Sequence, residues 1–460
     1  MRFLLLIPEV RELLAEGDHA GLLSVLQEMH PTDAASVLNA LNVGEIATIL
    51  ALLPPDLERD VFGYLEPDVQ EQFIAGAGRE RAQKVLQSML SDDRAEFLER
   101  FEPRVRDQLT CILPAAARED LLRRSTFRED QVGSFLSTDY AVLNPLLTAN
   151  SAIRELRRQA PSKETIYYSY VVDRTGKLVG FVSLRDLIVA DDSTQDGEIM
   201  KTDLVSVTAE DDQEKAARII RDYDLLALPV VDTAGRLVGI VTHDDAVDIV
   251  EEEAQEDFEK MAGVTGHGVE IGDYDYLEEP VWRQVRRRAP VICVLALLWV
   301  ITSTVIQGFE EHLTRGLLIA LLPMVMATGG MVGTQASALV IRALTVGDIS
   351  TAKIGTVVWK ELRVAGVMAL LLGGIAFINS VLVSRAASAP DAFATVAHAG
   401  LIIGIAMVGH VLTAALLGAL TPLVVKQLRG DPAMISTPAV TAIADLTGAA
   451  IYLILVTTML

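Results

Sequence analysis

Long apolar stretches dominate the chain after Pro280, whereas shorter amphipathic patterns fill the part before it. The apolar stretches lie at about 289–307, 317–341, 364–384, 398–423 and 435–459. A helix of about 20 apolar residues is long enough to cross the hydrocarbon core of a bilayer. The pattern therefore predicts five membrane-spanning helices, with the lipid bilayer as their surroundings.

Basic residues in the loops between these stretches predict how the helices are oriented. Ten of them lie on one side of the membrane: Arg283, Arg286, Arg287, Arg288, Arg342, Lys353, Lys360, Arg363, Lys426 and Arg429. The other side carries Arg315 and Arg385. Because short cytoplasmic loops are enriched in Lys and Arg, we expect the N-terminal part in the cytosol and the C-terminus outside the plasma (inner) membrane.

The chain before about residue 130 has the pattern of short helices. Residues that suit helix starts recur at Pro31, Pro55, Pro67, Ser91 and Pro103, and each is followed by an amphipathic run. Proline fits the first helical turn, and serine or aspartate caps it. Starts spaced by about 12 or 24 residues suggest a stack of helical hairpins. An unrelated helical bundle remains an alternative on the pattern alone.

An internal repeat follows. Residues 170–186 align with residues 229–245 at a spacing of 59, and nine of the 17 aligned positions are identical. Each copy has the pattern of strand, glycine turn, strand and helix. Two copies packed together would bury the apolar strand faces that one copy leaves exposed. The repeat resembles a tandem pair of cystathionine-β-synthase (CBS) domains over about 135–250.

The resemblance to CBS pairs implies an adenine nucleotide, such as ATP, as a candidate ligand. In that family a Ser or Thr with an Asp three residues later contacts ribose and phosphate. The matching residues are Ser183 with Asp186 in the first copy, and Thr242 with Asp245 in the second. Tyr168 and Arg185 add a ring to stack on the base and a charge for phosphate in the first copy. The second copy is the weaker candidate, because Asp244 places extra negative charge there.

Residues 244–264 form an acidic linker that leads towards the first apolar stretch. On a helix, one stripe collects Asp245, Asp248, Glu252, Glu256 and Glu259, and the opposite face collects Val247, Val250, Ala254, Phe258 and Met261. Like charges at this spacing weaken a helix by a few tenths of a kcal/mol per pair. Lys260 is the single basic residue in the run. We favour a cation-sensing helix, and a plain solvated face is the alternative.

Charge divides the chain in the same place. Of the 39 basic and 62 acidic residues, 12 and 7 follow Pro280. The part before it is therefore strongly acidic, which disfavours nucleic acid as a partner and attracts cations.

In the membrane part, Asp445 sits near the middle of the last apolar stretch. Intramembrane acids are costly and mark ion or proton pathways. The alternative is an Asp held by a neighbouring hydroxyl, from Thr441 or Thr447.

The CBS-like pair, the acidic linker and the five apolar stretches together resemble the MgtE family of magnesium channels over essentially the whole chain. The most specific motifs are LLPMVMATGGMVGTQAS (321–337), DPAMISTPAVTAIADLTG (431–448) and the linker EEEAQEDFEKMAGV. The resemblance implies a multi-domain membrane protein with these parts: an all-α superhelical N domain (1–132), an α/β tandem CBS pair (133–192 and 193–246), a long linker or plug helix (247–272) and an all-α transmembrane domain of five helices (280–460).

The resemblance also implies a homodimer with one Mg²⁺ pore on its twofold axis, and a transport protein rather than an enzyme. Asp445 would be the central pore carboxylate, with Gly329, Gly330 and Gly333 along the same path. The family's cytosolic Mg²⁺-binding acids match Asp60, Asp92, Glu96, Asp212, Glu214, Asp224, Asp245, Asp248, Glu253, Glu256 and Asp257. High cytosolic Mg²⁺ would bridge these acids and hold the pore closed.

One position departs from the family pattern, since Met331 stands where the family usually has Asn. A thioether is a poor Mg²⁺ ligand, so a channel for Co²⁺, Mn²⁺ or Ca²⁺ and a non-conducting CBS-type sensor remain alternatives. An anion channel is disfavoured by Asp445. A membrane enzyme is disfavoured because His398 and His410 stand alone on apolar stretches, where we interpret them as packing residues.

Overall fold

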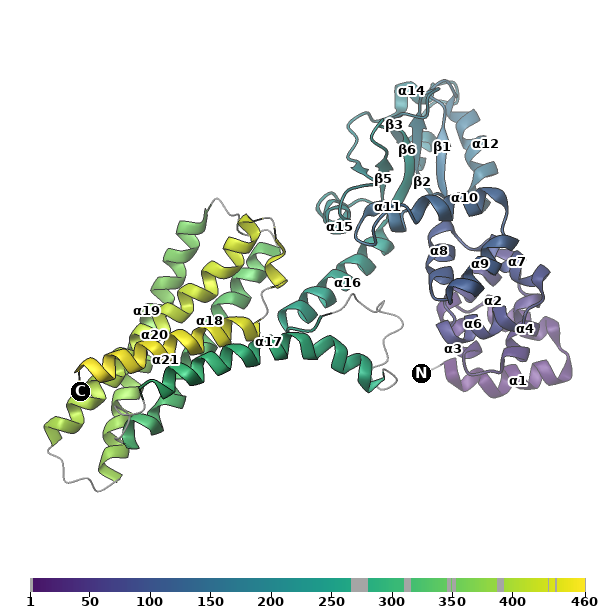
Figure 1. The fold of residues 1–460 in the computed structure, drawn as a ribbon. Helices are drawn as coiled ribbons and strands as arrows, with labels where there is room; N and C mark the ends of the chain where they lie inside the picture. Colours follow the sequence, from purple (N-terminus) through teal and green to yellow (C-terminus); the bar gives the residue numbers. More distant parts are fainter. Residues whose placement is uncertain are drawn as a thin grey trace. The chain divides into compact units, whose positions relative to one another are not determined.

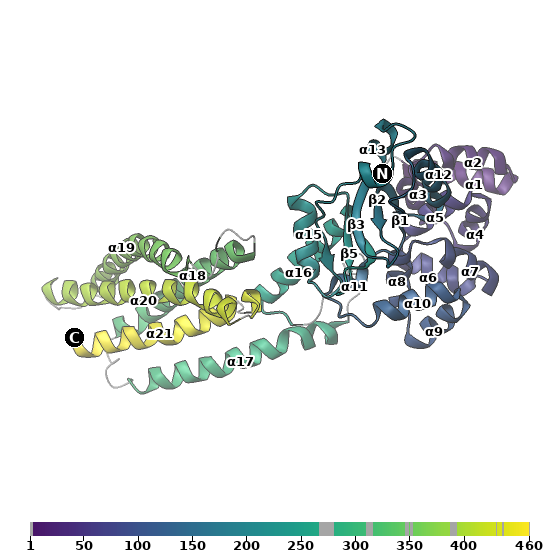
Figure 2. The same cartoon turned by 90° about the horizontal axis from the view of Figure 1, so that it is seen from above.

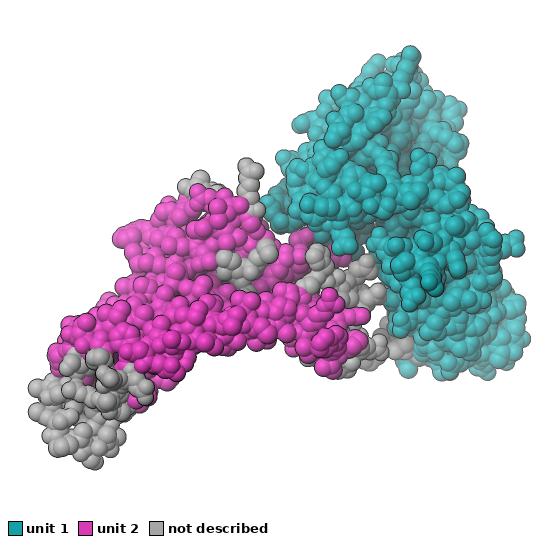
Figure 3. Space-filling view, in the orientation of Figure 1, with its two compact units in different colours: residues 1–251 teal, residues 252–460 magenta. Residues whose placement is uncertain are grey.

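The computed structural model describes residues 3–265, 280–309, 316–345, 349, 353–386, 393–428, 430–434 and 437–459. The end of the predicted linker, and Arg315 and Arg429 from the orientation prediction, lie outside these residues. The chain divides into two compact units, residues 1–251 and residues 252–460 (Figure 3). Each unit has its own apolar cores.

Short helices build the first part of unit 1 (Figure 1). After a 3-10 turn at Phe3–Leu6, they are α1 (Ile7–Glu16), α2 (His19–Gln27), α3 (Pro31–Leu38), α4 (Val43–Leu52), α5 (Pro55–Gly63), α6 (Pro67–Gly76), α7 (Arg79–Ser88), α8 (Ser91–Glu99), α9 (Pro103–Ile112) and α10 (Ala115–Arg124). All five predicted helix starts are confirmed. Proline works at the first helical position because that N–H has no partner inside the helix.

These helices stack in a regular way. α3 packs on α5, α4 on α6, α5 on α7, α7 on α9 and α8 on α10, so contact with the helix after next recurs along the stack. Phe62, Phe73 and Phe97 meet edge-to-face in the shared core. This repeated contact confirms the superhelical stack over an unrelated bundle.

The repeat forms two three-stranded sheets. The elements are α11 (Val132–Phe135), β1 (Tyr140–Leu143), α12 (Ala149–Gln159), a 3-10 turn (Ala160–Ser162), β2 (Thr165–Val172), β3 (Leu178–Ser183), α13 (Leu184–Val189), α14 (Asp196–Ile199), β4 (Val207–Thr208), α15 (Gln213–Asp222), β5 (Ala227–Val231), β6 (Leu237–Thr242) and α16 (His243–Met261). In each sheet the middle strand is parallel to the first and antiparallel to the last. The predicted strand–turn–strand–helix pattern is confirmed in both copies.

The two copies bind each other through their turns. Gly176 and Gly235 hold the turns at φ 82° and 78°, a region that glycine adopts without strain. Leu178 N–H donates to the Gly235 carbonyl at 3.1 Å, and Leu237 N–H donates to the Gly176 carbonyl at 3.2 Å. The matched turns therefore join the two sheets symmetrically, as expected for a CBS pair.

The linker helix α16 follows β6 directly. Ala246 and Ile249 bury its first turns in the core of the second CBS copy. Val247, Val250 and Phe258, on the predicted apolar face, are exposed in this chain. The apolar face of the linker is therefore left available along most of its length.

Unit 2 contains long apolar helices, seen from two directions in Figures 1 and 2. They are α17 (Val281–Gln307), α18 (Gly316–Thr345), α19 (Ile354–Ala386), α20 (Phe393–Gln427) and α21 (Thr437–Met459). Within the described residues, five helices are long and apolar enough to cross a membrane, as predicted. α17 and α19 begin about ten residues before their apolar stretches, because helix formation continues past the point where hydrophobicity ends.

α20 lies at the centre of this unit and packs on α18, α19 and α21, while α17 runs along α21. Glycines allow the closest approaches. A side chain at Gly418 of α20 would come 2.1 Å from the carbonyl oxygen of Gly333 on α18. Small residues at helix contacts are typical of membrane bundles, where packing rather than hydrophobic burial holds helices together.

Candidate functional site

Asp445 lies near the middle of α21 and is half-buried. Thr441, one turn earlier, shares its face of the helix, and both face Gly330 of α18. A side chain at Gly330 would come 3.0 Å from the Thr441 methyl group and 3.6 Å from the Asp445 carboxylate oxygen Oδ1. The absence of a side chain at Gly330 thus keeps the carboxylate accessible.

The neighbouring threonines do not hold this carboxylate. Thr441 Oγ1 donates to the Thr437 carbonyl at 3.2 Å. Thr447 Oγ1 donates to the Ala444 carbonyl at 3.0 Å and the Ile443 carbonyl at 3.1 Å. Each hydroxyl has one proton, and the helix backbone takes it. The geometry therefore does not support an Asp445 satisfied by a neighbouring hydroxyl.

The other two glycines of the predicted path face α20. A side chain at Gly329 would come 1.8 Å from His410 Nε2, and one at Gly333 would come 3.1 Å from the Ala414 carbonyl. Their observed role is to let α20 approach α18. Gly330 is the glycine of the three that faces Asp445.

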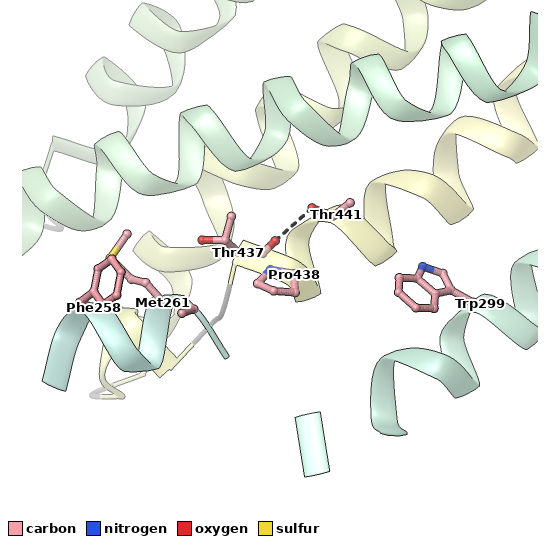
Figure 4. A pocket seen from close by; sticks show the side chains of 7 residues that line it. Phe258, Met261, Trp299, Thr437, Pro438 and Thr441 are labelled. Carbon is pink, nitrogen blue, oxygen red and sulfur yellow. Dashed lines mark hydrogen bonds between the residues drawn. The ribbon is translucent and has the colours of Figure 1, made fainter. Parts of the chain in front are cut away.

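A pocket of about 480 Å³ lies at the start of α21, within unit 2 (Figure 4). Its lining comes from the end of the linker, from α17 and from α21: Phe258, Met261, Ala262, Trp299, Thr437, Pro438 and Thr441. The pocket is mostly apolar, and Thr441 connects it to the Asp445 face. The end of the linker helix therefore sits next to the helix that carries the candidate pore carboxylate.

Ion pairs hold the end of the linker against the membrane helices. Lys260 Nζ lies 2.7 Å from Asp431 Oδ2, before α21, and 2.9 Å from Glu256 Oε1. Although burial opposes the charged form, these two carboxylates raise the pKa of Lys260 above its usual range. Glu259 pairs with Arg287 of α17, and both side chains are largely buried.

Three carboxylates meet in unit 1. Asp92 stands in the first turn of α8, Glu164 just before β2 and Asp245 in the first turn of α16. One oxygen from each lies within 4.8 Å of the others, and all three residues are half-buried. Burial is the main cause that raises the pKa of each carboxyl, and for Asp92 the charges of Glu164 and Asp245 add to it.

This cluster fits a hard cation. Asp92 Oδ1 and Glu164 Oε2 are shut off from solvent and have no hydrogen-bond partner within the described part of the chain. Opposite ligands of an octahedral Mg²⁺ ion lie about 4 Å apart, close to the observed spread of the oxygens. Carboxylates are the ligands that Mg²⁺ takes in proteins. A bound cation would also relieve the repulsion among three acids.

Other predicted acids lie around this cluster. Asp248, one turn after Asp245, has a raised pKa because of burial and then because of nearby acids that include Glu96. Glu96 itself pairs with Arg100 on the same helix. Asp60 pairs with Arg59 at 2.9 Å. Asp248 and Glu96 therefore extend the acidic patch, whereas Asp60 has a basic neighbour.

The structure places the three predicted acids of the second CBS copy at opposite ends of α15. Asp212 caps the start of the helix by accepting from Glu214 N–H at 2.9 Å, and Glu214 pairs with Arg218. Asp224 lies beyond the end of α15 with φ 51°. A ten-residue helix is about 15 Å long, so one chain does not bring Asp224 to the other two acids.

The remaining predicted acids lie on the part of α16 that belongs to unit 2. Glu256 pairs with Lys260, and Asp257 Oδ2 accepts from Thr345 Oγ1 of α18 at 3.4 Å. Glu253 lies one turn before Asp257. This segment therefore meets the membrane helix α18 through a polar contact, while Phe258 and Met261 line the pocket beside it.

The candidate nucleotide residues of the first CBS copy lie together. Tyr168 and Ser183 are paired across β2 and β3. Ser183 caps α13 by accepting from Asp186 N–H at 3.1 Å. Lys201 Nζ lies 3.2 Å from Asp186 Oδ2, and Ser183 and Lys201 lower the pKa of Asp186. Arg185 is exposed beside them.

In the second copy, Thr242 Oγ1 donates to Asp245 Oδ2 at 2.7 Å, and Asp245 belongs to the acidic cluster instead.

Two features of these sites were missed from the sequence. Glu164 completes the acidic cluster, and Asp431 pairs with Lys260. In each case the partners lie far apart along the chain, so no local pattern indicates the contact. The one available signal was the run of acidic residues around Lys260. It predicted a bound cation, but it did not show that Lys260 itself supplies a positive charge to these acids.

The fold and these sites define a multi-span membrane transport protein with an attached CBS pair. Family models match three parts: the divalent cation transporter domain named MgtE at residues 322–455, the MgtE intracellular N domain at 29–130, and CBS domains at 132–193 and 197–252. The magnesium transporter MgtE of Thermus thermophilus is 34% identical over 448 residues, which covers 96% of each chain. The chain belongs to the MgtE family of magnesium transporters.

Two further comparisons agree. The magnesium transporter MgtE of Bacillus subtilis is 29% identical over 448 residues, covering 97% of this chain and 96% of its own. A crystal structure of the soluble part of a magnesium transporter matches with a TM-score of 0.51 and 30% identity, over 54% of this chain and 98% of the other. The family membership confirms that the protein is a multi-pass membrane transporter and not an enzyme.

Proposed function

We propose that this protein is a magnesium channel in which Asp445 is the ion-binding carboxylate of the pore. The observation that carries the proposal is the position of Asp445, half-buried on a membrane helix and facing the bare backbone at Gly330. Mg²⁺ gives up its water reluctantly. A half-buried carboxylate beside bare backbone suits a hydrated ion held through its water shell.

A homodimer would complete this site. Asp445 is partly open, and α17 beside it buries little of its apolar surface in this chain. A second copy related by a twofold axis would bring a second Asp445 to the same path and cover apolar surface. Two carboxylates would then neutralise one divalent ion.

Cytosolic Mg²⁺ would close the channel by binding to the acids of unit 1 and the linker. Asp92, Glu164 and Asp245 offer one such site, in which Asp92 Oδ1 and Glu164 Oε2 are shut off from solvent and lack a hydrogen-bond partner in the described chain. Ions shift a conformational equilibrium only through tighter binding to one state. A near-complete switch needs about 5.5 kcal/mol of differential binding, so several acidic sites would act together.

The linker helix would carry this signal to the pore. Its end lines the same pocket as the start of α21 through Phe258 and Met261, and Lys260 and Glu259 pair with Asp431 and Arg287 of the membrane unit. At low Mg²⁺, repulsion among the acids near the start of α16 would favour movement of the linker. Asp445 would then be opened to the cytosolic side.

Two finer assignments accompany this proposal. The first CBS copy would bind an adenine nucleotide, with Tyr168 against the base and Asp186 on the ribose hydroxyls. The excess of basic residues in the loops on one side would place the N-terminal unit in the cytosol and the C-terminus outside the plasma membrane.

Uptake selectivity tests the proposed ion. Met331 is 63% exposed on α18, one residue after Gly330, and this position favours a second candidate, a channel for Co²⁺, Mn²⁺ or Ca²⁺. The experiment measures uptake of each ion into liposomes that contain the full-length protein. Uptake of Mg²⁺ should be faster than uptake of the other ions. Faster uptake of Co²⁺, Mn²⁺ or Ca²⁺ would show that this ion, and not Mg²⁺, is the one the protein transports.

A further inference from the structure

His410 is a fully buried polar residue near the middle of α20. Burying a polar ring in a membrane helix is costly unless the ring has a role or a partner. The ring faces the backbone carbonyl of Met326 on α18. Among the described residues of α20, no other polar side chain is fully buried.

The imidazole fills two positions where side chains are missing. A side chain at Gly329 of α18 would lie 1.8 Å from His410 Nε2, and one at Gly448 of α21 would lie 2.3 Å from Cε1. Both distances are far inside van der Waals contact. The ring therefore occupies the space that both glycines vacate, and it touches α18 and α21 at once.

These two glycines flank the Asp445 site. Gly329 precedes Gly330, which faces Asp445, and Gly448 follows Asp445 by almost one helical turn. A change in the ring would shift both backbone segments that frame the carboxylate. Functional groups need support of this kind, because an error of about 0.5 Å in placement already affects a site.

We propose that His410 is a positioning residue for ion conduction. Its ring acts as a spacer between α18 and α21 that sets the distance between Gly330 and Asp445. His410 does not touch the ion in this arrangement and acts through the two glycines. The inference rests on the proposed role of Asp445 in the pore.

The test compares single-channel currents of the full-length protein in planar bilayers. His410→Ala removes the spacer. Val411→Ala is the matched control, since Val411 is also fully buried on α20 and belongs to the apolar core of the unit. Both variants should lower the melting temperature. His410→Ala should also lower the unitary Mg²⁺ conductance several-fold and change the Mg²⁺ to Co²⁺ current ratio, whereas Val411→Ala should leave both as in the parent.

A second variant covers the case in which His410→Ala fails to fold. Gly448→Ala should clash with the ring, and the double variant Gly448→Ala/His410→Ala should restore assembly because the methyl group fills part of the space. The double variant should still conduct poorly. Parental conductance in either His410 variant would overturn the spacer role. An Asp445→Ala channel that conducts normally would instead overturn the pore assignment, so the two failures are distinguishable.

Discussion

The ammonium group of Lys260 lies between two carboxylates, 2.7 Å from Asp431 and 2.9 Å from Glu256. Asp431 precedes α21, and Glu256 lies on the linker helix one turn before Lys260. The Lys260 ammonium group therefore occupies the place where a bound cation would bridge the linker and the membrane helices. This contact between the linker helix and the residue before α21 forms without a bound ion.

Lys260→Met should weaken closure at low Mg²⁺. The change leaves two neighbouring carboxylates without their shared cation, and each partly exposed pair is worth at most about 1 kcal/mol. The expected result is a higher open probability in patch recordings without Mg²⁺, with closure still reached when Mg²⁺ is added. Lys426→Gln, an exposed lysine at the end of α20, is the control for general loss of charge. Overlapping open probabilities for Lys260→Met and the parent would contradict this role.

Glu164→Gln should have opposite effects with and without Mg²⁺. Without Mg²⁺, removing one of three crowded charges should raise the melting temperature of the full-length protein. With Mg²⁺, the loss of a ligand should raise the Mg²⁺ concentration needed for half-maximal closure several-fold. Glu198→Gln, an exposed acid on α14, should change neither. An unchanged Mg²⁺ dependence in Glu164→Gln would remove this residue from the cation site.

Stability should depend on pH in EDTA and much less so in Mg²⁺. Burial is the main cause that raises the pKa of Glu164, to about 7, and burial also raises the pKa of Asp92 and Asp245. A raised pKa means that the folded state holds its proton more tightly than the unfolded chain does. This stabilisation is therefore present at pH 4 and lost as the pH rises through about 7 for Glu164.

The melting temperature in EDTA should thus fall between pH 5 and pH 8. Added Mg²⁺ should restore it at pH 8 and release protons on binding. Calorimetry in two buffers of different ionisation enthalpy measures that release. A melting temperature in EDTA that rises over this range would show that the acidic cluster is not held together as described.

Much of the architecture could be predicted because its signals are local. The five Pro and Ser helix starts, the glycine turns at Gly176 and Gly235 and the apolar stretches each depend on a few neighbouring residues. The ends of the membrane helices were harder to predict, since α17 already includes the arginines that precede its apolar stretch. Hydropathy alone does not indicate where a helix begins.

The candidate sites were predicted less completely. Asp445 stood out because a lone acid in an apolar stretch is conspicuous, and Asp92 and Asp245 came from the family resemblance. Glu164 and Asp431 were missed because their partners are brought to them by tertiary packing. His410 was interpreted as a packing residue, and its contacts with Gly329 and Gly448 depend on three helices that no single segment specifies.

Asp186→Asn should abolish nucleotide binding by the first CBS copy. Asp186 is the group that would accept the ribose hydroxyls, and the amide cannot accept both. Titration of the full-length protein with ATP measures the effect, and Asp191→Asn, an exposed acid after α13, is the control. Equal ATP affinity in the Asp186 variant and the parent would place the nucleotide elsewhere or remove it from the account.

The position of Asp445 is the central claim, and the Mg²⁺ current of the full-length protein tests it most directly. Currents are recorded at low cytosolic Mg²⁺ for the parent, Asp445→Asn, Asp445→Ala and the control Thr447→Val, with the amount of folded protein measured in the same membranes. The parent and the control should conduct, whereas both Asp445 variants should lose the Mg²⁺ current while remaining folded. An undiminished Mg²⁺ current in Asp445→Ala would contradict the account.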